Sequence, residues 1–202
     1  MHDIVIVGAG GFAKEIAFLI DDINREKKQW NLLGFIDKDA TTKGKNIGKY
    51  QILDTDNWLV KYKNRIHAVF AIGDPIINYQ LSKKLKTNNN IIFPNVIHPT
   101  VIADWNQIKI GHGNVICAQS IITTNIVIGS YNMINLRTLI GHDGVIGSYN
   151  VINPAAMFSG DVRMGDCNLI GTHSKIIQGV NIGSHIKVAI GSVVMSNIVK
   201  KG

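Results

Sequence analysis

The sequence predicts two parts, a small α/β domain in residues 1–92 and a parallel β-helix in residues 93–202. Alternating apolar strands and helical segments predict the α/β domain. An apolar residue at every sixth position of a long stretch predicts the β-helix, a solenoid that buries one row of side chains per coil. These apolar positions are Ile110, Ile116, Ile122, Ile128, Ile134, Ile140, Ile146, Ile152, Phe158, Met164, Ile170, Ile176, Ile182, Val188 and Val194.

The α/β domain is expected to begin with a buried strand at residues 4–7, a glycine-rich turn and a helix. In that helix Phe12, Ile16, Leu19 and Ile20 recur at helical spacing. The following elements are a strand at 32–36, a loop at 38–49, strands at 51–53 and 68–72, a helix at 76–86 and a strand at 91–93. This alternation favours a parallel sheet.

The repeat is expected to start at Val96 and Ile102 and to be interrupted by two extra residues within 104–109. From Ile110 to Val194 its phase is unbroken, so no long loop leaves the solenoid. Three repeats make one triangular coil of eighteen residues. Burying each Ile stabilises the fold by roughly 1.5–3 kcal/mol, so a shift of register would be costly. We therefore expect residues eighteen apart to stack.

Composition excludes several classes of protein. The net charge is +7, but the basic residues are scattered rather than clustered in a stripe, which argues against nucleic acid. A positive field that attracts anionic small ligands and a generic basic surface both fit this charge. There is no apolar run of eighteen residues, and Lys14 and Glu15 interrupt the apolar start, so we expect a cytoplasmic protein without membrane insertion. Cys117 and Cys167 are expected to be reduced thiols.

The segment GAGGFA, residues 8–13, satisfies the pattern G-x-G-x-x-A between a strand and a helix, as in Rossmann-like domains. Gly8, Gly10 and Gly11 would let backbone N–H groups approach a phosphate at the helix N-terminus. Asp37, at the end of the second strand, would accept from a ribose hydroxyl. The alternatives are an NAD-binding fold and a purely structural turn. Fewer than a hundred residues precede the solenoid, which favours a mononucleotide or sugar nucleotide.

His142 is the candidate catalytic residue of the solenoid. It lies eighteen residues before Gly160, so the next coil, about 4.8 Å away, would offer it a bare backbone N–H and room for a ligand. Asp143 would orient the ring, provided that the corner turns both side chains to one side. The same spacing stacks Asn135 on Asn153, where their side chains could form an amide ladder. A purely structural role is the alternative for this ladder. An ordinary surface histidine is the alternative for His142.

No metal site is expected within one chain. Of the histidines in the repeat, only His112 and His185 fall near the same corner, and they are four coils apart. A zinc site assembled between subunits, as in hexapeptide enzymes similar to carbonic anhydrase, is the alternative.

The combination of GAGGFAKEI, IHPT at residues 97–100 and unbroken hexads with a His-Asp pair resembles the bacterial sugar O- and N-acyltransferases over nearly the whole chain. The family acetylates amino sugars on nucleotide carriers, and some members act on sialic acid. The resemblance implies a left-handed β-helix, a homotrimer, and acetyl-CoA in the groove between adjacent solenoids.

The resemblance also implies residue roles. His142 would be the general base, Asp143 its support, and the Gly160 N–H would face the thioester carbonyl. Asn135 would enter the site from the neighbouring subunit. The nucleotide-sugar cradle would contain Gly8, Gly10, Gly11, Asp37, Lys38, Ile72 and Gly73.

Three features depart from the family pattern. Phe12 and Val151 stand where histidines are common, and the usual G-x-P-A-K type ending is missing before Gly202. Phe12 in place of a histidine puts direct phosphate or sugar contact at residue 12 in doubt. The missing ending puts contacts to the adenine end of the coenzyme in doubt.

The sequence therefore predicts acetyl transfer from acetyl-CoA to the amine of a nucleotide-linked amino sugar in bacterial surface polysaccharide biosynthesis, without an acyl-enzyme. O-acetylation of sialic acid or another sugar is the alternative within enzymes. A non-catalytic trimeric protein that binds a nucleotide sugar is the alternative outside them.

Overall fold

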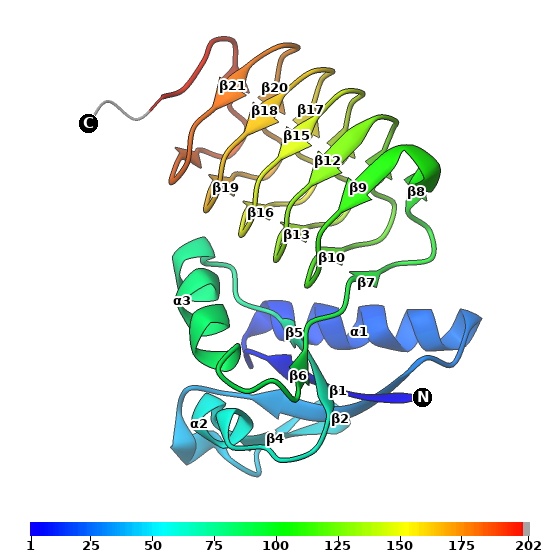
Figure 1. Ribbon diagram of the computed structural model, residues 1–202, viewed down its shortest axis with the longest axis vertical. Helices are drawn as coiled ribbons and strands as arrows, with labels where there is room; N and C mark the ends of the chain where they lie inside the picture. The colour runs from blue at the N-terminus through cyan, green and yellow to red at the C-terminus, as the bar shows by residue number, and fades with distance from the viewer. Residues whose placement is uncertain (200–202) are drawn as a thin grey trace. The chain divides into compact units, whose positions relative to one another are not determined.

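The computed structural model describes residues 1–199 and consists of two compact units (Figure 1). The first unit contains Met1–Gly73 and Ile77–Val96, and the second contains Asp74–Ile76 and the chain from Ile97 onward. The first unit thus extends to Val96, beyond the boundary at residue 92 that the sequence suggests. Its fold is α/β, and that of the second is a left-handed parallel β-helix, as the sequence and its resemblance predict.

The first unit is built on a six-stranded sheet with the order β3-β4-β2-β1-β5-β6. All neighbouring pairs are parallel except β3 and β4. Ile4, Val5 and Ile6 in the central strand are fully buried. The strands are β1 (His2–Val7), β2 (Trp30–Ile36), β3 (Asn46–Ile47), β4 (Tyr50–Asp54), β5 (Ile66–Phe70) and β6 (Ile91–Ile92).

Three α-helices connect these strands: α1 (Gly11–Glu26), α2 (Asp56–Val60) and α3 (Pro75–Leu85). Helix α1 buries Ile16, Leu19 and Ile20, as their spacing predicts, whereas Phe12 is only half-buried. The sequence did not indicate α2, β3 or the 3-10 helix at Ala40–Thr42. These segments are too short to show a hydrophobic period.

Gly34 marks a bulge in β2. The pairing of β1 with β2 runs from Ile4–Leu32 directly to Val5–Gly34. Gly34 has a φ of +153°, and a Cβ there would lie 2.3 Å from the carbonyl oxygen of Gln51 in β4. The close approach of β4 therefore requires glycine at this position.

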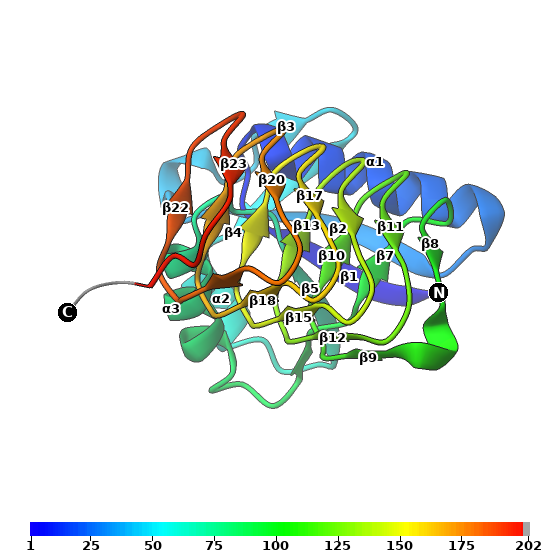
Figure 2. The same ribbon diagram turned by 90° about the horizontal axis from the view of Figure 1, so that it is seen from above.

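The described part of the β-helix has three faces, whose strands stack in parallel (Figures 1 and 2). The first face contains β7 (Val96–Ile97), β10 (Val115–Ile116), β13 (Met133–Ile134), β16 (Val151–Ile152), β19 (Leu169–Ile170) and β22 (Lys187–Val188). The second contains β8 (Ile102–Ala103), β11 (Ile121–Ile122), β14 (Leu139–Ile140), β17 (Met157–Phe158), β20 (Lys175–Ile176) and β23 (Val193–Val194). The third contains β9 (Ile108–Ile110), β12 (Ile126–Ile128), β15 (Val145–Ile146), β18 (Arg163–Met164) and β21 (Asn181–Ile182).

The eighteen-residue stacking is confirmed. Ile122 pairs with Ile140, and Ile140 pairs with Phe158. Each repeat position is the last residue of its strand, and all are buried except Ile110, which is half-buried. One apolar column per face therefore fills the interior of the solenoid.

The phase expected before Ile110 is wrong by one residue. Ala103 pairs with Ile122, whereas Ile102 points outward and is 66% exposed. Ile97 and Ala103 both pack against the core. The interruption therefore adds one residue, and the 3-10 helix at Trp105–Gln107 replaces the tight corner there.

Every corner between strands from β9 onward turns on a residue with positive φ, three positions after the repeat residue. Glycine, asparagine and aspartate tolerate this left-handed conformation best, although other residue types also adopt it here. The residues at all of these corners are Gly113, Gln119, Asn125, Tyr131, Arg137, Asp143, Tyr149, Ala155, Asp161, Cys167, His173, Gly179, His185 and Gly191.

The amide ladder suggested for Asn135 and Asn153 does not form, because both side chains bond to the backbone. Asn135 Oδ1 accepts from the N–H of Leu136, and Asn153 Nδ2 donates to the oxygen of Ile170. A ladder exists at another corner, where Asn132 Nδ2 donates to Asn114 Oδ1 and Asn150 Nδ2 donates to Asn132 Oδ1. These distances are 3.1 and 3.0 Å. The ladder side chains are fully buried.

Candidate active site

His142 and Asp143 occupy the corner between β14 and β15. Nδ1 of His142 lies 2.7 Å from Oδ2 of Asp143. Asp143 has a φ of +61°, so the corner turns its side chain toward that of its neighbour, which an extended strand would not do. The predicted pair therefore forms, with both side chains about half exposed to solvent.

A residue that the sequence did not suggest holds the aspartate. Nδ2 of Asn125, one coil earlier at the same corner, donates to Oδ1 of Asp143 over 2.5 Å. The hydrogen bond with His142, followed by that from Asn125, lowers the pKa of the Asp143 carboxyl from its ordinary value. Asp143 is therefore a carboxylate at neutral pH. The eighteen-residue spacing of Asn125 from Asp143 is the signal that could have identified it.

The imidazole lies directly against Gly160 of the next coil. A Cβ on Gly160 would be 2.4 Å from both Cε1 and Nε2 of His142, so no side chain fits beside the ring. Within residues 1–199, the Gly160 N–H and His142 Nε2 form no hydrogen bond. A proton acceptor and a backbone donor are therefore close together, and neither has a hydrogen-bond partner in the described part of the chain.

Asn135 lies apart from this pair in a single chain. It follows β13 at the corner between the first and second faces, whereas His142 follows β14 at the next corner. Asn135 is 8% exposed, and its backbone oxygen accepts from the hydroxyls of Ser120 and Thr138. Within the described chain, its role is to stabilise its own corner.

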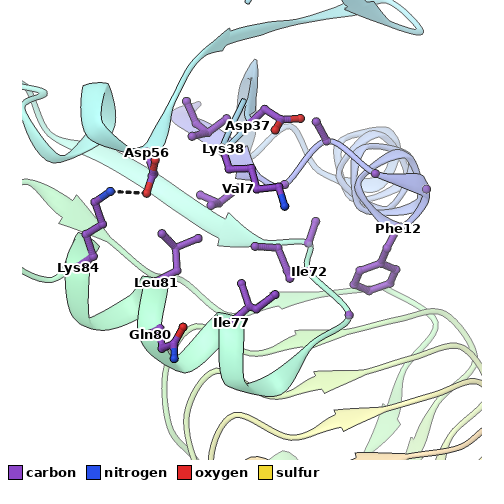
Figure 3. A pocket seen from close by; sticks show the side chains of 17 residues that line it. Val7, Phe12, Asp37, Lys38, Asp56, Ile72, Ile77, Gln80, Leu81 and Lys84 are labelled. Carbon is purple, nitrogen blue, oxygen red and sulfur yellow. Dashed lines mark hydrogen bonds and ion pairs between the residues drawn. The ribbon is translucent and has the colours of Figure 1, made fainter. Parts of the chain in front are cut away.

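The first unit contains a cavity of about 700 Å³ at the carboxyl ends of β1, β2 and β5 (Figure 3). The cavity lies at the topological switch point of the sheet, because β2 and β5 flank β1 on opposite sides. Open α/β sheets bind ligands at such a point. Every residue of the predicted cradle lines this cavity: Gly8, Gly10, Gly11, Asp37, Lys38, Ile72 and Gly73.

The glycine turn leaves its backbone accessible to a ligand. Gly8 has a φ of +120°, and a Cβ there would lie 2.8 Å from the oxygen of Ala71. At Gly10 and Gly11 a Cβ would meet nothing within 4 Å, so open space faces the start of α1. The first turn of α1 contains no acidic residue. This arrangement can bind a phosphate through N–H groups and the helix dipole.

Asp56 and Lys84 also line the cavity, and the sequence did not suggest either of them. Lys84 Nζ lies 2.6 Å from Asp56 Oδ2. Ile77 and Leu81 contribute apolar side chains to the same wall. Asp56 and Lys84 are twenty-eight residues apart, so only the folded chain brings them together.

Other reactive groups lie away from His142. Cys117 and Cys167 are buried and form no disulfide within residues 1–199, and burial, with a contribution from Asp166, raises the pKa of the Cys167 thiol. Within residues 1–199 no three His, Cys, Asp or Glu side chains are grouped so that they could hold a metal ion. The same stretch of chain has no helix with the length and apolarity needed to cross a membrane.

Residues 3–85 match the family model of the PglD N-terminal domain. No curated protein matches the sequence.

Solved structures match over almost the whole chain. The acetyltransferase domain of PglB from Neisseria gonorrhoeae, in complex with acetyl coenzyme A, has a TM-score of 0.86 at 23% identity, covering 98% of this chain and 92% of that one. A variant of perosamine N-acetyltransferase from Caulobacter crescentus, in complex with CoA and GDP-perosamine, has a TM-score of 0.87 at 23% identity, with coverages of 98% and 90%. WeeI from Acinetobacter baumannii has a TM-score of 0.73 at 25% identity, with coverages of 98% and 97%. The resemblance to the sugar acyltransferases is thus confirmed in the fold.

Proposed function

We propose that this protein is an N-acetyltransferase that transfers the acetyl group of acetyl-CoA to the amine of a nucleotide-linked amino sugar. The observation that carries the proposal is the His142–Asp143 pair, whose free Nε2 lies beside the backbone of Gly160. The cavity at the glycine turn supports a nucleotide as the carrier of the sugar. The ligands of the similar structures, acetyl coenzyme A in one and GDP-perosamine in another, support the same reaction.

His142 would act as the general base. The sugar amine attacks the thioester carbonyl, and Nε2 of His142 takes a proton from the amine as the C–N bond forms. Nδ1–H remains bonded to the Asp143 carboxylate, which stabilises the imidazolium. The C–S bond then breaks, and the proton passes from His142 to the leaving thiolate.

The Gly160 N–H would stabilise the oxyanion that forms on the thioester carbonyl. Loss of one such donor typically costs about 2.7–4 kcal/mol in the activation barrier. Transfer would be direct, because Cys117 and Cys167 are buried and belong to other corners of the solenoid. No acyl-enzyme is needed.

The second face supports a homotrimer. Its outward positions are mostly apolar, and Ile102, Met157 and Val193 are 66%, 44% and 57% exposed. Asn135 and His142 lie at the two corners that border this face. Cyclic packing through the face would bring Asn135 of one subunit toward His142 of the next, and acetyl-CoA would bind in the groove between them. The reaction would take place in the cytoplasm, as a step of surface polysaccharide biosynthesis.

The proposal is tested with acetyl-CoA and a panel of UDP-, GDP- and dTDP-linked amino sugars. We expect release of free CoA thiol with at least one of them, together with an amide product detected by mass spectrometry. Free sialic acid serves as the hydroxyl acceptor in a parallel reaction. Acetylation of the hydroxyl alone would contradict N-acetylation, and nucleotide-sugar binding without CoA release would contradict an enzymatic role.

A further inference from the structure

The ion pair at one side of the cavity leaves hydrogen-bonding groups available to a ligand. Asp56 begins α2, Lys84 lies near the end of α3, and their side chains are 19% and 42% exposed. Within residues 1–199, Asp56 Oδ1 accepts no hydrogen bond and Lys84 Nζ donates only to Asp56. A free acceptor oxygen is therefore adjacent to free ammonium protons.

The pair lies where the base of a bound nucleotide would extend. The phosphates of a nucleotide would bind to the N–H groups of the glycine turn, and Asp37 at the end of β2 would accept a hydrogen bond from the ribose. Figure 3 shows Asp56 and Lys84 on the side of the cavity opposite Phe12, the second residue of α1. The apolar side chain of Leu81 lies beside the pair, and that of Ile77 lies further along α3, next to Ile72. Apolar walls suit the faces of a base, and a polar pair suits its edge.

The chemistry of the pair favours one class of base. A lactam presents a carbonyl oxygen next to an N–H, and guanine, uracil and thymine each have this edge. The ammonium of Lys84 can donate to the carbonyl while the carboxylate of Asp56 accepts from the N–H, so both bonds are charge-assisted. Adenine and cytosine offer a less acidic amino group and a ring nitrogen instead.

We propose that Asp56 and Lys84 read the edge of the nucleobase and select lactam bases over adenine and cytosine. This inference rests on the proposed function, since it takes the ligand to be a nucleotide. Guanine adds a second N–H next to the first, so a GDP-linked substrate would let the carboxylate accept two hydrogen bonds.

The test measures the affinity of the full-length protein for GDP, UDP, dTDP, ADP and CDP by calorimetry. We expect at least one lactam nucleotide to bind at least about 10-fold more tightly than ADP and CDP. Asp56→Asn and Lys84→Gln should each weaken binding of that nucleotide by about 10- to 100-fold, which would remove the preference. The nucleotide that binds most tightly identifies the base.

Lys43→Gln is the matched control. It breaks the Lys43–Asp54 pair in the same unit, whose side chains are 62% and 20% exposed and do not line the cavity. This variant should retain wild-type affinities for all five nucleotides. Melting temperatures of Lys84→Gln and Lys43→Gln should be similar, which separates base recognition from a role in folding.

Equal affinity of the wild type for all five nucleotides would overturn the inference, and so would a preference that persists in both Asp56→Asn and Lys84→Gln. Absence of any nucleotide binding would overturn it as well. The proposed function has a separate readout, because acetyl transfer without base preference would remove this inference alone. A clear base preference without CoA release would instead remove the proposed function.

Discussion

The imidazole of His142 occupies the space that a side chain on Gly160 would need, since a Cβ there would lie 2.4 Å from its Nε2. Gly160→Ala should therefore displace the ring while leaving the coil in place. A displacement of about 1 Å can cost about 10²-fold in rate, so we expect kcat to fall by about that factor. Steady-state kinetics with acetyl-CoA and the accepted amino sugar would measure the loss.

Gln178→Ala is the matched control, because Gln178 is exposed at the same corner one coil further on. It should retain wild-type kcat. Normal turnover of Gly160→Ala would show that the contact between the two coils does not position His142.

Much of this site could be predicted from the sequence because the repeat converts sequence distance into stacking. The phase that pairs Ile140 with Phe158 also places His142 beside Gly160. The phase before Ile110 was predicted wrongly because Ile102 and Ala103 are both apolar. A one-residue shift between them therefore leaves no mark in the pattern.

Contacts between side chains of distant segments could not be predicted in this way. Asp56 and Lys84 meet through the packing of two helices, and neither belongs to a motif. Asn125 is at a stacked position, but an asparagine at such a corner is already explained by its tolerance of positive φ, so its bond to Asp143 did not stand out. The sequence therefore predicted the catalytic pair and the glycine turn but not the residues that hold or extend them.

Asp143→Asn should lower kcat, because an amide cannot stabilise the imidazolium as a carboxylate does. Loss of the corresponding charge in a catalytic triad costs about 10⁴-fold. For the half-exposed Asp143 we expect a reduction of at least roughly 10-fold. Asn125→Ala should give a smaller loss, because it removes only the support of the carboxylate. Parallel assays of both variants would check this order, and a larger loss in Asn125→Ala would contradict it.

Asp143 should also make folding stability depend on pH in the acid range. Its pKa in the folded protein lies below the ordinary value of 3.8. The stabilisation is therefore fully present above that value and is lost as pH falls through the folded pKa. Chemical denaturation of wild type and Asp143→Asn across this range should show less acid sensitivity in the variant. Parallel curves for the two proteins would contradict the assignment.

Asn132→Ala should destabilise the β-helix. The Asn132 side chain is fully buried, donates to Asn114 and accepts from the backbone N–H and side chain of Asn150. Removing it leaves buried polar groups without partners, which costs at least about 1–3 kcal/mol. Urea denaturation would measure this. Asn181→Ala, at an exposed position, should change the free energy of unfolding far less.

Met157→Lys should disrupt the homotrimer. Met157 is 44% exposed on the outward side of the second face, and a charge there would be buried in the proposed interface. Sedimentation should show monomers. Val127→Lys introduces the same charge at a 43% exposed position on the third face and should leave the trimer intact. A trimeric Met157→Lys protein would place the interface elsewhere.

The role of His142 as the general base is tested by measuring kcat for acetyl transfer by His142→Asn at saturating acetyl-CoA. The variant removes the free Nε2 while keeping a polar side chain beside Gly160. General-base catalysis typically contributes about 10²- to 10⁴-fold, so kcat should fall by that amount while the KM for acetyl-CoA stays near that of the wild type. A kcat within about threefold of wild type would contradict the role of His142 as the base.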